Sequence, residues 1–566
     1  MKTNQLFKIS TLLLFSTSFL LSNKLHSQEP TFEWAKKMGG DLGLFWDKTA
    51  VDLEGNLFTI GIFSDTVDFD PTGNVFNLTA IGEFDIFITK LDSDGNFVWT
   101  KQFGGDDLVT YPQIDIDTEG NIYFSGGLFG IVDFDPSAET YNLSSAIGAA
   151  FVCKLSNDGN LIWVTKVFES QIYFVNSINV DNDGNVYTTG CFADTTDFDP
   201  GDGVYNMFPS GGMVDIYISK LNSDGLFVWA KKMGGNSNEE GMSIYVDPLF
   251  NVYSTGYFSG TSDFDPSENI YEFTEVYNGM YISKLDGEGS FVWAKVINGT
   301  DQIASIKTDG YGSVYIQGNF SDTTDFDPSE NTYSLIPIGT ETFLLKLDVN
   351  GNFLWVKKVA RNLYSLGGPI HIDVFDAVYL TGGYIETYDF DPGESIYNLS
   401  SIGSNDIYIT KLDVDGNLLW AKSIGGPGAD EGISLQGDLL GNIYLTGNFN
   451  GIVNFNPSGE PFNLDSPQNS STFTLKLSQP GFVGIKENDD KNLIIVYPNP
   501  SSGLFTIDLK EKTKIIVTNI LGETVLQQNF GAGRQIINLQ GEANGIYFAR
   551  ININEAQILK LIKNEN

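Results

Sequence analysis

The sequence is poor in the residues from which many enzymes build their sites. It has two cysteines, Cys153 and Cys191, and two histidines, of which only His371 lies beyond the first 27 residues. This count excludes a zinc site built from several histidines and a Cys-x-x-Cys redox motif, and a Ser-His-Asp triad would depend on His371 alone. We interpret His371 as a hydrogen-bonded strand residue. We expect the two cysteines to pack as small apolar side chains, because two cysteines cannot form a disulfide framework.

Basic residues are also scarce. There are 32 Lys and Arg against 72 Asp and Glu, a net charge of -40. Residues 481–566 hold nine basic and nine acidic residues, so the whole excess of negative charge lies before them. Such a surface repels phosphate backbones, which excludes nucleic acid as an expected partner. It also keeps a protein soluble, and it attracts cations.

Long apolar runs are lacking after the N-terminus. Residues 1–27 combine Lys2 and Lys8 with a mostly apolar stretch from Ile9 to Leu21 and a small residue, Ser27, which predicts a secretory signal peptide. No later stretch reaches the roughly 20 apolar residues that a membrane-spanning helix needs. We therefore expect an exported monomer without a transmembrane segment after signal removal, which passes through the periplasm and is secreted or held at the outer-membrane surface.

The chain is rich in one repeated motif, Asp-Phe-Asp-Pro. The motif occurs seven times, the last copy having asparagine in place of both acids: Asp68 to Pro71, Asp133 to Pro136, Asp197 to Pro200, Asp263 to Pro266, Asp325 to Pro328, Asp389 to Pro392 and Asn454 to Pro457. Tryptophans follow the same period: Trp34, Trp99, Trp163, Trp229, Trp293, Trp355 and Trp420. A fixed period of this length predicts a repeat architecture whose units bury their apolar faces against one another.

Each repeat predicts four short strands. In the third repeat, residues 177–180 and 185–189 form one hairpin pattern, and residues 215–221 and 226–231 form another. No long stretch of the mature chain has helical periodicity with caps, so the fold class is all-β. The repeat region begins with a fourth strand, at residues 32–36, and ends with a third, at residues 473–477. If these two ends pair, no long edge stays exposed. We therefore predict a seven-bladed β-propeller over residues 28–480, with repeats of about 64 residues.

Units such as Asp183-Gly184-Asn185-Val186-Tyr187 resemble the SBBP-type bacterial β-propeller repeats, a resemblance that covers all seven units and implies no particular activity. After a polar linker at residues 481–492 the composition changes. Short alternating strands between Gly, Pro and Asn turns predict a small β-sandwich. Tyr497-Pro498-Asn499-Pro500, Gly545-Ile546-Tyr547-Phe548 and the terminal Lys560 to Lys563 resemble the type A C-terminal sorting domain of type IX secretion. This resemblance implies that residues 493–566 direct export through the type IX secretion machinery.

The repeated acids are the candidate metal ligands. Strand alternation would place the two carboxylates of each motif on one face, where paired carboxylates can hold calcium. The residues concerned are Asp68, Asp70, Asp133, Asp135, Asp197, Asp199, Asp263, Asp265, Asp325, Asp327, Asp389 and Asp391. In the other interpretation, which we favour, the acids accept backbone N–H bonds in a turn. The seventh copy supports the turn, because Asn454 and Asn456 keep the acceptor oxygens and lose both charges.

Two functions remain open from the sequence. The first is a non-catalytic binding or scaffold module that presents its loops to an extracellular polysaccharide or protein. The second is a carbohydrate-active enzyme, a glycosidase or lyase, that uses carboxylates in the propeller channel. Acids repeated in every unit indicate a scaffold, whereas a catalytic pair should be confined to one or two repeats and converge on the axis. No catalytic residue and no cofactor other than calcium is indicated.

Overall fold

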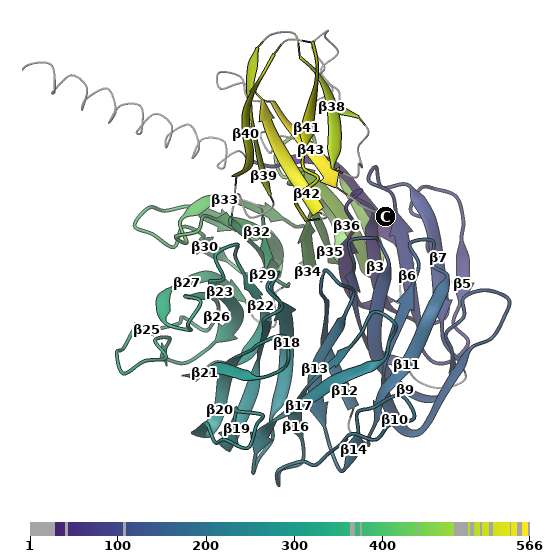
Figure 1. Cartoon of the computed structure of the whole chain (residues 1–566), viewed down its shortest axis with the longest axis vertical. Helices are drawn as coiled ribbons and strands as arrows, with labels where there is room; N and C mark the ends of the chain where they lie inside the picture. The colour runs from purple at the N-terminus through teal and green to yellow at the C-terminus, as the bar shows by residue number, and fades with distance from the viewer. Residues whose placement is uncertain are drawn as a thin grey trace, which may run out of the picture. The chain divides into compact units, whose positions relative to one another are not determined.

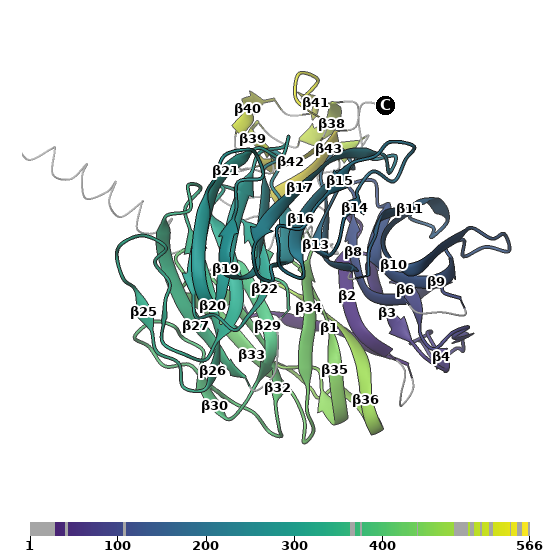
Figure 2. The same cartoon turned by 90° about the horizontal axis from the view of Figure 1, so that it is seen from below.

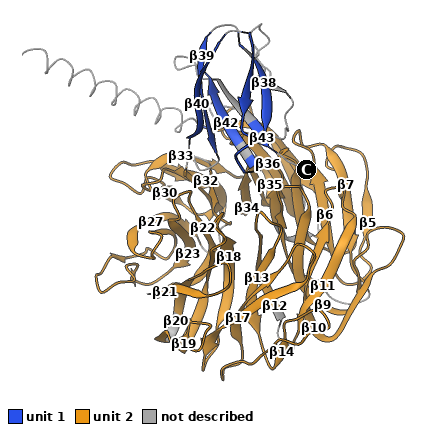
Figure 3. Ribbon diagram, viewed as in Figure 1, with its two compact units in different colours: residues 1–29, 479–566 blue, residues 30–478 orange. Residues whose placement is uncertain are grey.

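A computed structural model describes residues 29–566 except 40–43, 106–108, 172, 363–367, 374–375, 439, 480–495, 498–502, 510–511, 520–523, 532, 544, 552–556 and 564–566. Every regular element in this part of the chain is a strand, so the all-β prediction is confirmed (Figure 1). Residues 30–478 form one compact unit and residues 479–566 belong to another (Figure 3). The predicted signal peptide and the predicted linker lie outside the described residues. No helix of the described part is long and apolar enough to cross a membrane.

The strands of residues 30–478 form antiparallel groups of four that follow the repeats, and we number these groups as sheets 1 to 7. Sheets 3 and 4 are joined by a short ladder from Gly234 and Gly235 to Asp263 and Ser262. The first strands are β2 (Leu44–Val51), β8 (Val109–Ile116), β12 (Tyr173–Val180), β18 (Glu240–Val246), β22 (Gln302–Thr308), β28 (His371–Ile372) and β34 (Glu431–Gly437). The second strands are β3 (Leu57–Phe63), β9 (Ile122–Asp133), β13 (Val186–Phe192), β19 (Val252–Asp263), β23 (Val314–Phe320), β29 (Val378–Tyr384) and β35 (Ile443–Asn454).

The third and fourth strands complete each sheet. The third strands are β6 (Asp85–Leu91), β10 (Asn142–Leu155), β16 (Asp215–Leu221), β20 (Glu272–Leu285), β26 (Thr340–Leu347), β32 (Asp406–Leu412) and β36 (Asn463–Ser478). The fourth strands are β7 (Phe97–Phe103), β11 (Leu161–Glu169), β17 (Phe227–Gly235), β21 (Phe291–Asn298), β27 (Phe353–Asn362), β33 (Leu418–Ile424) and, in sheet 7, β1 (Thr31–Met38). Short ladders precede the third strand in four sheets: β4 (Thr66–Asp68) with β5 (Asn77–Thr79), β14 (Thr196–Asp197) with β15 (Asn206–Met207), β24 (Thr324–Asp325) with β25 (Ser334–Leu335), and β30 (Thr387–Asp389) with β31 (Asn398–Ser400).

The two ends of this unit pair with each other. The N-terminal strand β1 runs antiparallel to β36, the last strand of the repeat region, from Thr31 opposite Ser478 to Met38 opposite Thr472. In Figure 2 the label of β1 stands close to the green strands of sheet 7, of which β1 is the edge strand next to β36. The side chains of Ala35 and Met38 are buried, so both faces of β1 contribute to the core. The predicted pairing of a fourth strand from the N-terminus with a third strand from the C-terminus is confirmed.

The first strands contact one another in series. β2 contacts β8, β8 contacts β12, β12 contacts β18, β18 contacts β22, β22 contacts β28, β28 contacts β34, and β34 contacts β2. This sequence of contacts returns to its starting point. Several second and third strands are buried along their whole length, as in β3, β13, β23, β6 and β32, so these sheets are packed on both faces. Cys153 and Cys191 are buried, free thiols in these strands, as expected.

The C-terminal unit has two sheets. One contains β37 (Val496–Tyr497), β38 (Leu504–Leu509) and β41 (Gly533–Asn538), and the other contains β39 (Thr513–Asn519), β40 (Thr524–Phe530), β42 (Gly545–Ile551) and β43 (Gln557–Lys563). Alternate apolar residues of both sheets, such as Phe505 and Ile507 from one and Ile515 and Val517 from the other, form a common core. This is the predicted small β-sandwich.

Candidate functional site

The Asp-Phe-Asp-Pro motif forms a turn in which the acids bind backbone amides. In the third repeat, Asp197 Oδ1 accepts the N–H of Asp199 at 3.1 Å and the N–H of Tyr205 at 2.7 Å. The Phe198 ring is fully buried and packs on Phe168, with ring centroids 4.8 Å apart. The phenylalanine therefore anchors the loop, while the first aspartate holds its backbone.

The seventh copy makes the same bonds without charge. Asn454 Oδ1 accepts the N–H of Asn456 at 3.1 Å and the N–H of Phe462 at 2.9 Å. In the described residues no group of three or more His, Cys, Asp or Glu side chains is placed to hold a metal ion. The calcium role of the twelve motif aspartates stays a prediction, and the structure does not bring acids of different copies together into one cluster.

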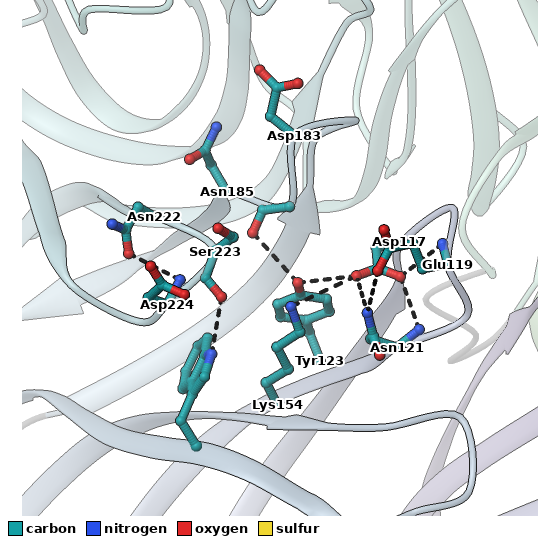
Figure 4. A network of polar contacts seen from close by, with 12 residues as sticks. Asp117, Glu119, Asn121, Tyr123, Lys154, Asp183, Asn185, Asn222, Ser223 and Asp224 are labelled. Atoms are coloured by element: carbon teal, nitrogen blue, oxygen red, sulfur yellow. Dashed lines mark hydrogen bonds and ion pairs between the residues drawn. The ribbon is translucent and has the colours of Figure 1, made fainter. Parts of the chain in front are cut away.

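The hairpin turn after each first strand holds a second set of acids, which Figure 4 shows for the second repeat. Asp117 Oδ1 accepts the N–H groups of Glu119 and Asn121 at 3.0 and 2.8 Å. Its Oδ2 accepts the Tyr123 hydroxyl at 3.1 Å and lies 3.9 Å from Lys154 Nζ. Burial, reinforced by the Asp117 charge, raises the pKa of Tyr123 far above its ordinary value, so the phenol remains a donor.

The same arrangement returns along the chain. A hydroxyl from the second strand donates to the turn aspartate in these pairs: Tyr187 to Asp181, Tyr253 to Asp247, Tyr315 to Asp309, Tyr379 to Asp373 and Tyr444 to Asp438. The lysine of each third strand lies over the aromatic ring, and in sheets 5 and 6 it also forms an ion pair of 3.2 Å with the aspartate. In these two sheets the lysine is therefore the partner of a buried carboxylate.

Neighbouring sheets are linked through the repeated tryptophans and tyrosines. Trp163 Nε1 donates to the Ser223 carbonyl of the next repeat at 3.0 Å, and the Tyr123 hydroxyl lies 3.5 Å from the Gly184 carbonyl (Figure 4). Gly225 in that turn has φ +77°, and a Cβ there would lie 2.9 Å from Trp163, so the turn requires glycine. Trp34 makes the equivalent bond from sheet 7 to the Ser93 carbonyl of sheet 1. The tryptophans therefore link neighbouring sheets.

A cavity of about 150 Å³ lies where the first strands meet, and residues of all seven first-strand segments line it. Its small polar side chains bind the backbone of the next strand. Ser177 Oγ accepts the N–H of Ile244, Ser243 Oγ accepts that of Ile306, and Ser305 Oγ accepts that of Ile370, each at 3.2 Å. Ser434 Oγ closes the series by accepting the N–H of Thr49 in β2 at 3.1 Å.

Lys48, Asp115 and Lys307 are the charged residues among the described residues that line this cavity, and the last two occupy one position of the repeat, two residues before the turn aspartate. That position holds Ala50, Asp115, Asn179, Tyr245, Lys307, His371 and Gln436. Sequence reasoning missed this set because it followed the positions that recur. Counting back from each turn aspartate would have revealed a position that changes in every repeat.

The carboxylate in the channel is bound on both oxygens. Asp115 Oδ2 accepts Asn179 Nδ2 and the N–H of Val180, both at 2.8 Å, and Oδ1 accepts the N–H of Ile116 at 2.9 Å. Burial raises the pKa of Asp115 in spite of these bonds, and burial also lowers the pKa of Lys307. Asp115 therefore joins sheets 2 and 3.

His371 is a neutral acceptor. Its Nδ1 accepts the N–H of Gly437 at 3.2 Å, and burial together with the Lys307 charge lowers its pKa to about 3. It lies beside Tyr379, with ring centroids 5.6 Å apart. The prediction of a hydrogen-bonded strand histidine is confirmed. In this environment the ring stays unprotonated at neutral pH and links sheets 6 and 7.

Comparison with known proteins identifies the C-terminal unit. Residues 495–564 match the secretion system C-terminal sorting domain, so this part of the chain is a type IX sorting domain and the protein is exported to the cell surface or the extracellular space. The chain is also 22% identical over 509 residues to an uncharacterized WD repeat-containing protein, L264, of Acanthamoeba polyphaga mimivirus, covering 75% of this chain and 36% of that protein. The chain thus spans about a third of the length of this relative.

Solved structures resemble the chain only distantly. PorZ, a surface component of the type IX secretion system of Porphyromonas gingivalis, is 13% identical with a TM-score of 0.28, covering 92% of this chain and 75% of PorZ. The gluconolactonase XC5397 of Xanthomonas campestris is 13% identical with a TM-score of 0.30, covering 70% of this chain and 91% of the enzyme. A protein of unknown function from Dyadobacter fermentans is 11% identical with a TM-score of 0.32, covering 67% and 95%. At these scores the likeness carries no argument about function.

Proposed function

We propose that the mature chain is a non-catalytic binding or scaffold module, exported by the type IX secretion machinery, whose sheets 1 to 7 are the blades of a closed β-propeller. The series of contacts between first strands and the pairing of β1 with β36 support the closed ring. The SBBP-type repeat is the sequence resemblance that accompanies this architecture. The ligand is an extracellular polysaccharide or protein, met by loops at the rim of the sheets.

The chemistry of the axial channel carries this proposal. Among the described residues that line the cavity, Asp115 is the one acid, and its two oxygens already accept three hydrogen bonds. Glycoside hydrolysis in its common form uses two carboxyl groups, about 5–10 Å apart, one of them an acid or base free to exchange a proton. The cavity of about 150 Å³ is also smaller than the roughly 300–1,000 Å³ of typical ligand pockets. This chemistry favours a structural axis over a carboxylate pair.

The loops before the third strands offer a better surface for a large ligand. They expose apolar side chains in several repeats, with exposed fractions of 62% for Ile81, 64% for Ile338 and 74% for Ile402, and Ile147 within β10 is 50% exposed. Repeated exposed apolar groups are typical of interaction surfaces. Because they recur around the ring, they suit a polymer or a protein that contacts several blades.

An assay of polymer cleavage tests the non-catalytic role. The purified mature chain and the Asp115→Asn variant are incubated with a panel of extracellular polysaccharides, and released reducing ends are measured alongside retention of the protein on each polymer. We expect both proteins to be retained equally on the polymer and neither to release reducing ends. If the parent chain released reducing ends and the Asp115→Asn variant did not, the result would contradict the proposal and support the enzyme hypothesis.

A truncation tests the export route. A chain that keeps its N-terminus and ends at Ser478 lacks the sorting domain and should accumulate in the periplasm, whereas the full chain should reach the cell surface or the medium. Cell fractionation of both, with a resident periplasmic protein as control, provides the measurement. Surface localisation of the truncated chain would show that another segment directs its export.

A further inference from the structure

Buried acids begin the third strand of several sheets. Asp85, Asp215, Glu341 and Asp406 occupy this place in sheets 1, 3, 5 and 6, and each side chain is 0–1% exposed. Each acid faces the residue three positions after the tryptophan of its own sheet. In sheet 1 that residue is Gln102, whose Nε2 donates to Asp85 Oδ2 at 2.5 Å. In sheet 3 it is Lys232, 3.5 Å from Asp215, and in sheet 5 it is Lys358, 3.0 Å from Glu341. These two acids therefore have a compensating positive charge.

Sheet 6 lacks this lysine. Ser423 stands in its place, and the Ser423 hydroxyl lies 3.5 Å from Asp406 Oδ2, which also accepts the N–H of Ile402 at 3.1 Å. The other oxygen, Oδ1, is buried and has no hydrogen-bond partner. Among the described residues, no lysine or arginine forms an ion pair with Asp406. A buried carboxylate with an unpaired oxygen and no counter-charge is costly.

A second buried acid lies beside it at the junction of sheets 6 and 7. Asp430 is 0% exposed, and its oxygens accept the N–H groups of Gly426 at 2.7 Å and Asn450 at 2.9 Å. The Asp406 carboxylate packs on the preceding glycine, since a Cβ on Gly425 would lie 2.1 Å from its Cγ. The two carboxylates thus lie against adjacent glycines. Burial, with the Asp406 charge adding to it, raises the pKa of Asp430 to about 6.

The junction of sheets 3 and 4 repeats this arrangement with one difference. Asp215 lies against Gly234, and Glu239 accepts the N–H of Gly235 at 3.2 Å, so two acids again flank a Gly-Gly pair. Here Lys232 is present, 3.5 Å from Asp215 Oδ2. Asp215 Oδ1, like Asp406 Oδ1, is buried without a hydrogen-bond partner. One junction therefore contains its own cation, and the other contains the corresponding pair of acids without one.

We propose that the junction of sheets 6 and 7 binds a hard cation, calcium, between the carboxylates of Asp406 and Asp430, in the role that Lys232 has at the junction of sheets 3 and 4. The unpaired Oδ1 of Asp406 is its first ligand, and calcium takes carboxylate, carbonyl and hydroxyl oxygens in flexible geometry. The cation ties the last two blades together. This inference goes beyond the proposed function, because it concerns an ion that stabilises the ring and not the polymer that the ring binds.

Calcium binding to the full chain tests the site, with a variant designed from the protein's own repeat. Ser423→Lys places at sheet 6 the lysine that sheets 3 and 5 have. Equilibrium dialysis counts the bound calcium, and thermal unfolding in excess calcium and in chelator follows its effect on stability. We expect Ser423→Lys to bind one calcium fewer than the parent chain and to lose the rise in unfolding temperature that calcium gives the parent.

A second variant and a control separate this site from other calcium sites. Asp406→Asn combined with Asp430→Asn should also lose one bound calcium, so the test does not depend on the folding of the lysine variant. Asp389→Asn, in the Asp-Phe-Asp-Pro turn of the same sheet, should keep it. Equal calcium binding by the parent, Ser423→Lys and the double variant would overturn the proposal. So would the absence of bound calcium together with a more stable double variant, because the two acids would then share a proton.

Discussion

A disulfide between the two ends of the repeat region would test the closed ring directly. Thr31 and Ser478 lie opposite each other at the end of the β1 and β36 ladder, and their hydroxyl oxygens are 2.9 Å apart. Thr31→Cys combined with Ser478→Cys should therefore form a disulfide under mild oxidation. The native Cys153 and Cys191 are buried, and burial raises the pKa of both thiols, so they should not compete.

The expected stabilisation is large because the two positions are far apart in the chain. Their separation is 447 residues. If the crosslink acts by lowering the entropy of the unfolded chain, closing such a loop is worth about 6 kcal/mol, an upper value that strain in the bond would reduce. That amount is comparable to the whole stability of many domains, which is about 5–15 kcal/mol.

Denaturant unfolding of the double cysteine variant, oxidised and reduced, gives the measurement. The oxidised protein should unfold at a higher denaturant concentration and migrate faster on a non-reducing gel, and each single cysteine variant should show neither effect. If both introduced thiols stayed titratable after oxidation, or if the crosslinked protein were no more stable than the reduced one, the ends would not be paired and the ring would be open.

Three further tests of the repeat chemistry use denaturant unfolding of five variants. Lys411→Met leaves a buried aspartate without its 3.2 Å ion-pair partner and should cost about 3–5 kcal/mol, whereas Lys90→Met, at the equivalent position without an ion pair to an acid, should cost less. Burial raises the pKa of Glu239 from 4.5 to about 7. The free energy of unfolding of the parent chain should therefore fall by up to about 3 kcal/mol as the pH rises through this window, and Glu239→Gln should remove this dependence on pH. Phe198→Ala leaves a cavity at a fully buried site and should lower the free energy of unfolding by about 3–5 kcal/mol. Asp197→Asn should lower it little, because the seventh repeat already has asparagine at this position. If Asp197→Asn lost stability only in the presence of calcium, the result would favour the metal prediction.

The sequence was a good guide to the fold because its signals recur. Each Trp, Lys and turn aspartate has the same local environment in successive sheets, so seven copies of a weak pattern predict the strands more reliably than one copy can. The pairing of β1 with β36 followed from the same counting, since a chain that begins with a fourth strand and ends with a third leaves two complementary edges.

The functional positions were harder to find for the same reason. The channel set from Ala50 to Gln436 has no common residue type, and nothing in a single repeat shows which strand is innermost. The carboxyl pair at sheets 6 and 7 was missed because Asp406 and Asp430 lie 24 residues apart and meet only when β32 and β34 pack against the Gly425-Gly426 segment. Such contacts depend on tertiary packing, which local pattern does not encode.

The comparison of equivalent positions therefore separates scaffold from specialised chemistry within this one chain. The first acid of the Asp-Phe-Asp-Pro motif has the same structural role in every repeat. In the seventh copy an asparagine replaces it, and its side-chain oxygen accepts the same backbone hydrogen bond. Where a repeat departs from sheets 3 and 5, as Ser423 does opposite Asp406, a buried carboxylate has no ion-pair partner among the described residues. Burying an uncompensated carboxylate is costly, and the partner that we propose for the two carboxylates of this junction is a cation from solution.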